Sequence, residues 1–167
     1  TRYKLVTGVQ TCALPICVMK PNAEELASAV GRSLLTNGDV IDAARELCGN
    51  GVECVLASLG ADGMIAVTHD HAWHAKTSKI KVINTVGAGD ATLAGFLSAV
   101  AAETQAEPEP ESGVGFDVAK GVSAAVQWGA VAVQQPTSGL QNLDHMPEVF
   151  LVENPDRSVP LDEPANI

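Results

Sequence analysis

The segment Asn84–Asp90, with the sequence Asn-Thr-Val-Gly-Ala-Gly-Asp, carries residue types that can bind an anion. Gly87 and Gly89 have no side chains, so their backbone N–H groups can approach an anion closely. The small, apolar residues after Asp90 predict a helix, and the amino end of a helix favours negative charge. An acidic side chain in the first turn of that helix would lie beside the anion. Asp90 could then take a proton from an attacking hydroxyl, while the N–H groups stabilise a phosphoryl group in transfer.

Two common nucleotide motifs do not fit this chain. The P-loop pattern G-x-x-x-x-G-K-[ST] does not occur in the sequence. The dinucleotide pattern G-x-G-x-x-G matches at Gly87 and Gly89 but has Thr92 in place of its third glycine. An ordinary helix, with glycine at its entry and Asp90 in its first turn, explains the segment equally well. On these residues alone both interpretations stay open.

The flanking sequence alternates between strands and helices, which predicts an α/β fold with a largely parallel sheet flanked by helices. Asn22 and Glu25 form a capping-box pattern at the start of a helix that ends before Gly31. The apolar run Val52–Ser58 is typical of a strand covered on both faces, and Gly60–Gly63 predicts a tight turn. The other expected elements are a strand ending at Lys20, helices at 39–48 and 88–103, a hairpin at 64–68 and 72–75, and a helix capped by Asp117 that runs to Val133.

Length and composition limit the function classes. The chain has 167 residues, of which 46% are hydrophobic and 18% charged, as expected for one globular α/β domain. A formal net charge of −10 argues against a nucleic-acid-binding protein, because phosphate contacts need lysine and arginine. No apolar stretch is long enough to span a bilayer, so no membrane partner is expected. The four cysteines show no zinc spacing, which favours free thiols and a cytoplasmic location.

The negative charge is concentrated in two segments. Residues 103–117 carry five acidic side chains and no basic one, and residues 134–167 carry six acidic side chains and Arg157 alone. The rest of the chain has nine acidic and nine basic residues. The charge therefore belongs to a loop over 103–115 and to an acidic tail expected at 141–167, and both are expected to be solvated surface.

The first sixteen residues do not resemble the rest of the chain. They have a charged start but no continuous apolar run, so they are not a signal peptide. Thr1–Ile16 instead resembles the conceptual translation of a common sequencing-library adaptor. We therefore expect this segment to be an assembly artefact, native sequence to begin at about Val18, and the N-terminal half of the protein to be missing. Amplification of the locus from genomic DNA tests this hypothesis, which an uninterrupted reading frame through these codons would exclude.

Four segments together resemble the ribokinase-like (pfkB) family of carbohydrate kinases. Asn84–Leu97 closely matches the second signature of that family. Lys20–Glu25 resembles its N-x-x-E element, and Ser58–Gly63 resembles its nucleotide-binding turn. Ser123–Ala132 is similar to the late helix that borders the adenine site. Because the segments agree with the family in order and spacing, residues 17–140 are identified as the C-terminal, nucleotide-binding part of such a kinase domain.

The resemblance implies ATP-dependent phosphorylation of a sugar hydroxyl, with ATP and Mg²⁺ as cofactors and Asp90 as the catalytic base. The other implied site residues are Gly87, Ala88 and Gly89 in the anion hole; Ser58, Gly60, Gly63, Ser123 and Gln127 at the nucleotide; and Asn22 and Glu25 at the metal, through water. Magnesium keeps several waters when bound, which is consistent with an indirect role for the last two side chains. Their capping-box explanation is physically complete and compatible with that role.

The acceptor is harder to assign, because the sugar-binding residues of the family normally come from the N-terminal half. The segments look most similar to the bacterial branch that converts fructose 1-phosphate to fructose 1,6-bisphosphate, so a sugar phosphate is the expected partner. Members that phosphorylate tagatose 6-phosphate or ribose are one alternative. A truncated, inactive fragment that only binds ATP is another, and a homodimer is one option for the assembly.

Overall fold

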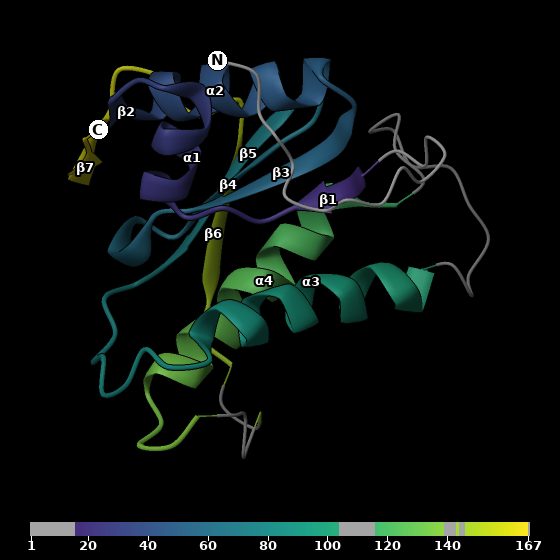
Figure 1. Ribbon diagram of the computed structural model, residues 1–167. Helices are drawn as coiled ribbons and strands as arrows, with labels where there is room; N and C mark the ends of the chain where they lie inside the picture. The colour runs from purple at the N-terminus through teal and green to yellow at the C-terminus, as the bar shows by residue number, and fades with distance from the viewer. Residues whose placement is uncertain (1–15, 104–115, 139–142, 144–145, 167) are drawn as a thin grey trace, which may run out of the picture.

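The computed structural model describes residues 16–103, 116–138, 143 and 146–166, which form an α/β fold. A five-stranded sheet is covered on one face by α1 (Ala23–Val30) and α2 (Asn37–Gly49) and on the other by α3 (Ala88–Glu103) and α4 (Val118–Val133) (Figure 1). The predicted α/β fold with a helix-flanked sheet is therefore confirmed. Among the described residues, no helix is long and apolar enough to cross a membrane.

The sheet mixes parallel and antiparallel pairs. Its order is β1–β3–β4–β5–β6, with β1 at Ile16–Met19, β3 at Val52–Ser58, β4 at Met64–Val67, β5 at Ala72–Thr77 and β6 at Val149–Glu153. The β1–β3 pair is parallel, and the other three pairs are antiparallel. The prediction of a largely parallel sheet thus holds for β1–β3 and is corrected elsewhere. The turns between β3 and β4 and between β4 and β5 are too short to join parallel strands, which need a long crossover.

Capping fixes the ends of α1 where the sequence predicts them. The Asn22 side chain accepts a hydrogen bond from the Glu25 backbone N–H, and the Glu25 carboxylate accepts one from the Asn22 backbone N–H. This is the predicted capping box, which satisfies two N–H groups at the helix start. Gly31 ends the helix in the left-handed region, at a φ of 68°, which favours glycine.

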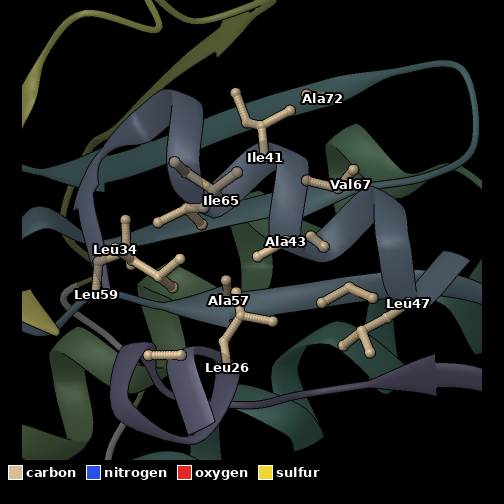
Figure 2. Close-up of a cluster of buried hydrophobic side chains, with 14 of the residues drawn as sticks. Leu26, Leu34, Ile41, Ala43, Leu47, Ala57, Leu59, Ile65, Val67 and Ala72 are labelled. Carbon is tan, nitrogen blue, oxygen red and sulfur yellow. The ribbon is translucent and has the colours of Figure 1, made fainter. Parts of the chain in front are cut away.

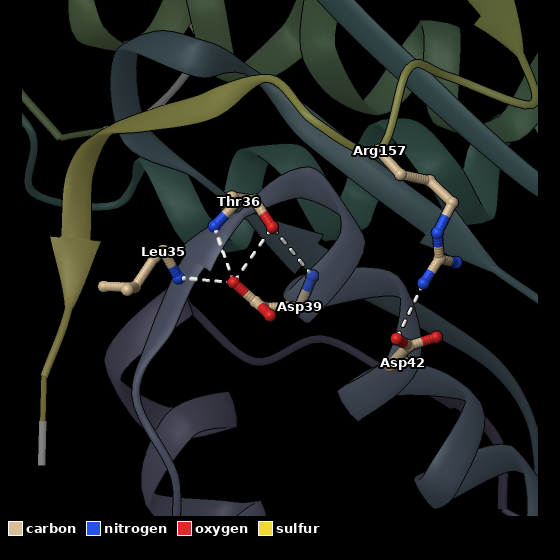
Figure 3. Close-up of polar contacts among 5 residues, drawn as sticks. All are labelled: Leu35, Thr36, Asp39, Asp42 and Arg157. Atoms are coloured by element: carbon tan, nitrogen blue, oxygen red, sulfur yellow. Dashed lines mark hydrogen bonds and ion pairs between the residues drawn. The ribbon is translucent and has the colours of Figure 1, made fainter.

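A second capping box starts α2 at Asn37, earlier than the predicted start at Asp39. Thr36 Oγ1 accepts from the Asp39 backbone N–H at 3.2 Å, and Asp39 Oδ2 accepts from the backbone N–H groups of Leu35 at 3.0 Å and Thr36 at 2.9 Å (Figure 3). These hydrogen bonds, first of all the one from Leu35, lower the pKa of the Asp39 carboxyl. The cap is therefore made by an ionised Asp39, and Thr36 marks the true helix boundary.

Two clusters of buried apolar side chains hold the helices to the sheet. The cluster under α1 and α2 includes Leu26, Ala43 and Ile65, all fully buried (Figure 2). The cluster under α3 and α4 includes Phe96, which is also fully buried. Burial of a large apolar side chain contributes roughly 1.5–3 kcal/mol to the free energy of unfolding. The two clusters therefore stabilise the sheet and its helices, which together support the loops at the edge of the sheet.

Two cysteines belong to these clusters. Cys48 and Cys54 are buried free thiols, as the cysteine spacing predicts. Burial raises the pKa of both thiols, that of Cys54 to about 12. Both groups therefore stay neutral near pH 7 and pack as small apolar side chains.

The C-terminal segment corrects the prediction of an acidic tail at 141–167. β6 pairs with β5, and β7 (Pro160–Ala165) pairs antiparallel with β2 (Leu34–Thr36). Leu161 and Ala165 of β7 are buried in the cluster under α1 and α2. The acidic side chains that the structure describes in this segment are exposed, namely those of Glu148, Glu153, Asp156, Asp162 and Glu163. The acidic composition therefore concealed a short apolar pattern whose partners are distant in sequence.

Two predicted segments lie outside the described residues. Thr1–Ile16, expected to be foreign, is described only at Ile16 in β1. The acidic loop expected at 103–115 is described only at Glu103, the last residue of α3. Both interpretations stay predictions.

Close contact between α3 and α4 depends on small residues at their interface. At Gly95 of α3, an added Cβ would lie 2.7 Å from the Ala124 carbonyl oxygen and 2.8 Å from Cγ of Trp128. At Gly121 of α4, it would lie 2.7 Å from the ring of Phe96. Glycine at these positions therefore sets the separation of the two helices and, with it, the position of the amino end of α3.

Replacing Gly95 by alanine is expected to lower the free energy of unfolding by about 1–3 kcal/mol, because the Ala124 carbonyl cannot retreat without displacing α4. Urea denaturation measures the change. Gly49→Ala is the matched control, since an added Cβ at Gly49 has no neighbour within 4 Å and alanine favours a helix. Equal unfolding free energies for the two variants would show that the helix contact is not tight.

Candidate active site

The ends of β1 and β3 bring two of the predicted segments together. The parallel pairing continues past the end of β1 to the last residue of β3, because the Ser58 backbone N–H donates to the Pro21 carbonyl oxygen at 2.9 Å and Asn22 forms a parallel bridge with Ser58. Neighbouring parallel strands end at the same edge of a sheet, where ligands commonly bind in α/β proteins. Ser58 therefore lies beside Asn22 and the start of α1, as the proposed nucleotide and metal roles require.

The Asn22–Glu25 capping box lies at this edge with both side chains exposed. Asn22 Oδ1 accepts from Glu25 N at 2.8 Å, and Glu25 Oε2 accepts from Asn22 N at 2.8 Å. A carboxylate has about four lone-pair directions, so the cap leaves Glu25 able to accept further hydrogen bonds. The geometry thus satisfies the capping explanation and keeps oxygen atoms available for a hydrated cation.

Lys20 connects this edge to the predicted anion site. A Cβ added to Gly89 would lie 3.4 Å from Lys20 Nζ, so the ammonium group lies against the first turn of α3. Lys20 begins the Lys20–Glu25 segment, in which the family resemblance implies roles for Asn22 and Glu25 alone. Its contact joins residues far apart in the chain, and no local pattern predicts it. The ammonium and the α3 amino end together form the most anion-attracting feature at this edge.

The loop before α3 is held by its neighbours. The backbone N–H groups of Ile83 and Asn84 both donate to the Val133 carbonyl oxygen at the end of α4, at 2.7 and 3.1 Å. Asn84 Oδ1 accepts from Val86 N at 3.0 Å and closes a local turn. Gly87 follows at a φ of 82°, a backbone conformation that favours glycine. This sequence of contacts turns the chain sharply into α3.

The first turn of α3 presents backbone N–H groups and a carboxylate. Gly89 and Asp90 are exposed there, and a helix leaves its first N–H groups without internal partners. The Ala88 N–H donates to the Thr85 carbonyl oxygen at 3.2 Å, so a role for Ala88 in the anion hole requires this long bond to open. Gly87 and Gly89 leave no side chain between a bound anion and the backbone.

The Gly60–Gly63 turn follows β3 at the same edge as Ser58. Residues 60–62 form a short 3₁₀ helix, and Gly60 and Gly63 have φ values of 59° and 83°. Both values lie in the left-handed region, which favours glycine. A Cβ added to Gly63 would overlap the Ala75 carbonyl oxygen. Glycine at position 63 is therefore required by the fold itself, and the presence of this glycine is explained whether or not the turn binds a nucleotide.

Among the described residues, the hydrogen bonds of the Ser123 and Gln127 side chains lie within α4 and toward β6, away from this edge. Ser123 Oγ donates to the Ala119 carbonyl oxygen, at 2.9 Å within α4. Gln127 Nε2 donates to the Pro147 carbonyl oxygen at 3.1 Å, just before β6. Their nucleotide roles stay predictions from resemblance, and the observed contact of Gln127 fastens β6 to α4.

Comparison with known proteins shows which chains share this arrangement. The chain is 52% identical over 82 residues to the 1-phosphofructokinase of Haloferax volcanii, covering 49% of this chain and 27% of that protein. It is 41% identical over 97 residues to the 1-phosphofructokinase of Escherichia coli (strain K12), covering 58% of this chain and 30% of that protein. Phosphofructokinase-2 from Escherichia coli, solved with substrates and products, superposes with a TM-score of 0.62 and 27% identity. That superposition covers 76% of this chain and 37% of the solved chain.

The matched segments thus span well under half the length of each of these relatives. A family model for "pfkB family carbohydrate kinase" matches residues 7–145. This range starts inside Thr1–Ile16, whose foreign origin stays a prediction, and it ends before β6. It contains every residue that the sequence places in the site, from Asn22 to Gln127. Because most of the chain matches, the chain belongs to the pfkB family of carbohydrate kinases.

Proposed function

We propose that residues 17–140 are the nucleotide-binding part of an ATP-dependent sugar-phosphate kinase. One observation carries the proposal: Lys20 Nζ lies against Gly89 at the amino end of α3, at the edge where Ser58 bonds to Pro21. A cation, a helix amino end and a carboxylate gathered at one edge suit the transfer of a phosphoryl group from a polyanion.

Asp90 serves as the general base in this proposal. Its carboxylate takes the proton of the acceptor hydroxyl, and the hydroxyl oxygen attacks the γ-phosphorus of ATP in line with the leaving oxygen. The new bond from the acceptor oxygen to phosphorus forms as the bond from phosphorus to ADP breaks, and the proton ends on Asp90. N–H groups of Gly87 and Gly89 donate to oxygens of the transferring group, and Lys20 offsets its negative charge.

The oxygen atoms of Asn22 and Glu25 fit a magnesium site held through water. Amide and carboxylate oxygens are the ligand types that this hard cation takes, and Mg²⁺ keeps several of its waters. The two side chains are held in place by the capping box and are exposed at the sheet edge. When bound there, Mg²⁺ supplies positive charge to the phosphate oxygens.

Fructose 1-phosphate is the acceptor that we propose first, giving fructose 1,6-bisphosphate, because the curated relatives are 1-phosphofructokinases. Tagatose 6-phosphate and ribose remain the alternative acceptors. We place the reaction in the cytoplasm, where free thiols such as those of Cys48 and Cys54 persist. ATP binding without turnover is the second candidate function, for a chain that spans 27% and 30% of these two relatives.

The acceptor is tested with protein from the complete genomic reading frame that contains this chain. Turnover is measured with ATP and Mg²⁺ on fructose 1-phosphate, tagatose 6-phosphate and ribose, and Mg·ATP binding is measured by calorimetry. We expect the highest kcat/KM with fructose 1-phosphate. A higher value with another sugar would reassign the acceptor, and binding without turnover on any sugar would favour the second candidate function.

Asp90→Asn is expected to lower kcat by about 10²–10⁴-fold while leaving the affinity for Mg·ATP nearly unchanged, because the amide cannot take the proton. Steady-state kinetics and calorimetry measure the two quantities. Asp117→Asn is the matched control: it removes the same charge at the start of α4, where asparagine also caps well. Near-normal turnover by Asp90→Asn would remove Asp90 from the role of base.

Glu25→Gln separates the capping role from the metal role. Glutamine can still accept the Asn22 N–H, so the melting temperature is expected to stay within a few degrees of the unmodified protein. Loss of the carboxylate charge is expected to raise the Mg²⁺ concentration for half-maximal rate by about tenfold. Glu24→Gln, on the same exposed first turn but outside the capping box, is the control. An unchanged Mg²⁺ requirement in Glu25→Gln would leave Glu25 as a cap only.

A further inference from the structure

The C-terminal strap, defined as residues 154–166, lies beyond the range that the family model matches. It leaves β6 at Asn154, which has a φ of 52°, an uncommon conformation for a residue other than glycine. It then crosses the start of α2 and ends as β7 beside β2. The strap therefore connects the five-stranded sheet to the two-stranded sheet.

The first part of the strap is fastened to the amino end of α2. The backbone N–H groups of Asn37 and Gly38 donate to the carbonyl oxygens of Val159 and Arg157, both at 2.9 Å. A Cβ added to Gly38 would lie 2.9 Å from the Arg157 oxygen, so glycine permits this approach. Arg157 also forms an ion pair with Asp42 at 2.7 Å (Figure 3).

The second part of the strap is fastened by β7. It pairs with β2 in antiparallel register, with Leu34 opposite Ala165 and Thr36 opposite Pro160. Leu161 and Ala165 are 6% and 2% exposed and pack in the cluster under α1 and α2. Both parts of the strap are thus anchored to the packed core, and the backbone between the anchors is fixed in space.

Within β7 the strap reaches the Gly60–Gly63 turn. The Asp162 backbone N–H donates to Asp62 Oδ2 at 2.8 Å, across a hundred residues of sequence. The Asp62 carbonyl oxygen also lies 2.6 Å from His74 Nε2 of β5. The central residue of the turn is therefore held from β5 by its backbone and from the strap by its side chain.

The turn needs such support because its own backbone is permissive. Gly60 and Gly63 each populate left- and right-handed conformations at little cost, and a single 3₁₀ turn has weak internal hydrogen bonds. Ligand affinity falls in proportion to the fraction of molecules with the turn in the binding conformation. An external hydrogen bond to Asp62 raises that fraction.

We propose that Asp62 is a positioning residue through which the C-terminal strap holds the Gly60–Gly63 turn in its nucleotide-binding shape. The proposal rests on the proposed function, because it assigns ATP as the ligand of the turn. Asp62 acts through the backbone of the turn and makes no contact with substrate in this scheme. Its effect is therefore on the affinity for Mg·ATP and not on the rate of phosphoryl transfer.

The test compares Asp62→Ala with Asp62→Asn in protein from the complete genomic reading frame. Alanine removes the acceptor of the Asp162 N–H, while asparagine Oδ1 can still accept it. Loss of one such hydrogen bond is expected to weaken Mg·ATP binding about fivefold with kcat unchanged. Amide hydrogen exchange at residues 60–63 should become faster in Asp62→Ala and stay unchanged in Asp62→Asn.

A second variant and a control make the test independent of folding defects at Asp62. Asp162→Pro removes the donor N–H in a strand that already contains Pro160 and Pro164, and it should reproduce the effects of Asp62→Ala. Arg157→Ala removes an exposed ion pair of the strap at α2 and should leave ATP affinity unchanged.

Three outcomes would overturn the proposal in different ways. If Asp62→Ala keeps the wild-type affinity for Mg·ATP and the wild-type rate of amide hydrogen exchange at residues 60–63, the positioning role alone is overturned. Equal loss of affinity in Arg157→Ala would show a general loosening of the strap and would also overturn it. Absence of ATP binding by the unmodified protein would overturn the proposed function, while hydrogen exchange, which needs no ATP, would still report whether the strap holds the turn.

Discussion

The parallel pairing of β1 with β3 is the constraint on which the candidate site depends. β3 is buried on both faces, with Cys54 and Leu56 in one cluster and Val55 and Ala57 in the other. If β3 shifted by one residue along β1, the apolar side chains that face one cluster would exchange places with those that face the other. The two sets are similar in size, so the hydrophobic pattern alone fixes the register weakly. The register is fixed at the ends of the strands, where the Ser58 N–H donates to the Pro21 carbonyl oxygen. Correct pairing of these ends places the Gly60–Gly63 turn near the start of α1.

The amino end of α3 is positioned by α4. Glycine contacts along the helix pair fix their separation, and the Val133 carbonyl oxygen at the end of α4 accepts two N–H groups from the loop before α3. That second contact matters for charge as well as shape, because the carboxyl end of a helix carries unpaired carbonyl groups of negative character. The two hydrogen bonds to the Val133 carbonyl oxygen reduce the negative potential near the site that we propose for phosphate.

Local signals explain which features the sequence can predict. Both ends of α1 follow from Asn22 and Gly31, and the start of α4 follows from Asp117, because the hydrogen bonds of these residues lie within a few residues of the helix boundary. β6 and β7 escape prediction, because their partners are distant in sequence and their acidic composition resembles a tail. The contact of Lys20 with Gly89 is hidden for the same reason. Resemblance to the family found the site segments, but only the fold shows that Gln127 bonds to the Pro147 carbonyl.

The charge distribution gives the proposed nucleotide an orientation. The net charge of −10 would repel ATP if it acted uniformly, but it is screened within about 10 Å at 0.1 M salt, so the nearest groups decide. Near the Gly60–Gly63 turn those groups include Asp62 and Glu163, whose Oε2 lies 3.9 Å from a Cβ position on Gly60. At the amino end of α3 they are Lys20, the helix dipole and the carboxylate of Asp90, so that end carries positive charge that the glycine turn lacks. For the proposed function, the triphosphate would therefore lie at the α3 end of the edge, and the glycine turn, flanked by acids, would suit the uncharged nucleoside. The same orientation would bring the transferring phosphoryl group beside Asp90, the base of the proposed mechanism, and would leave the strap at the nucleoside end of the edge.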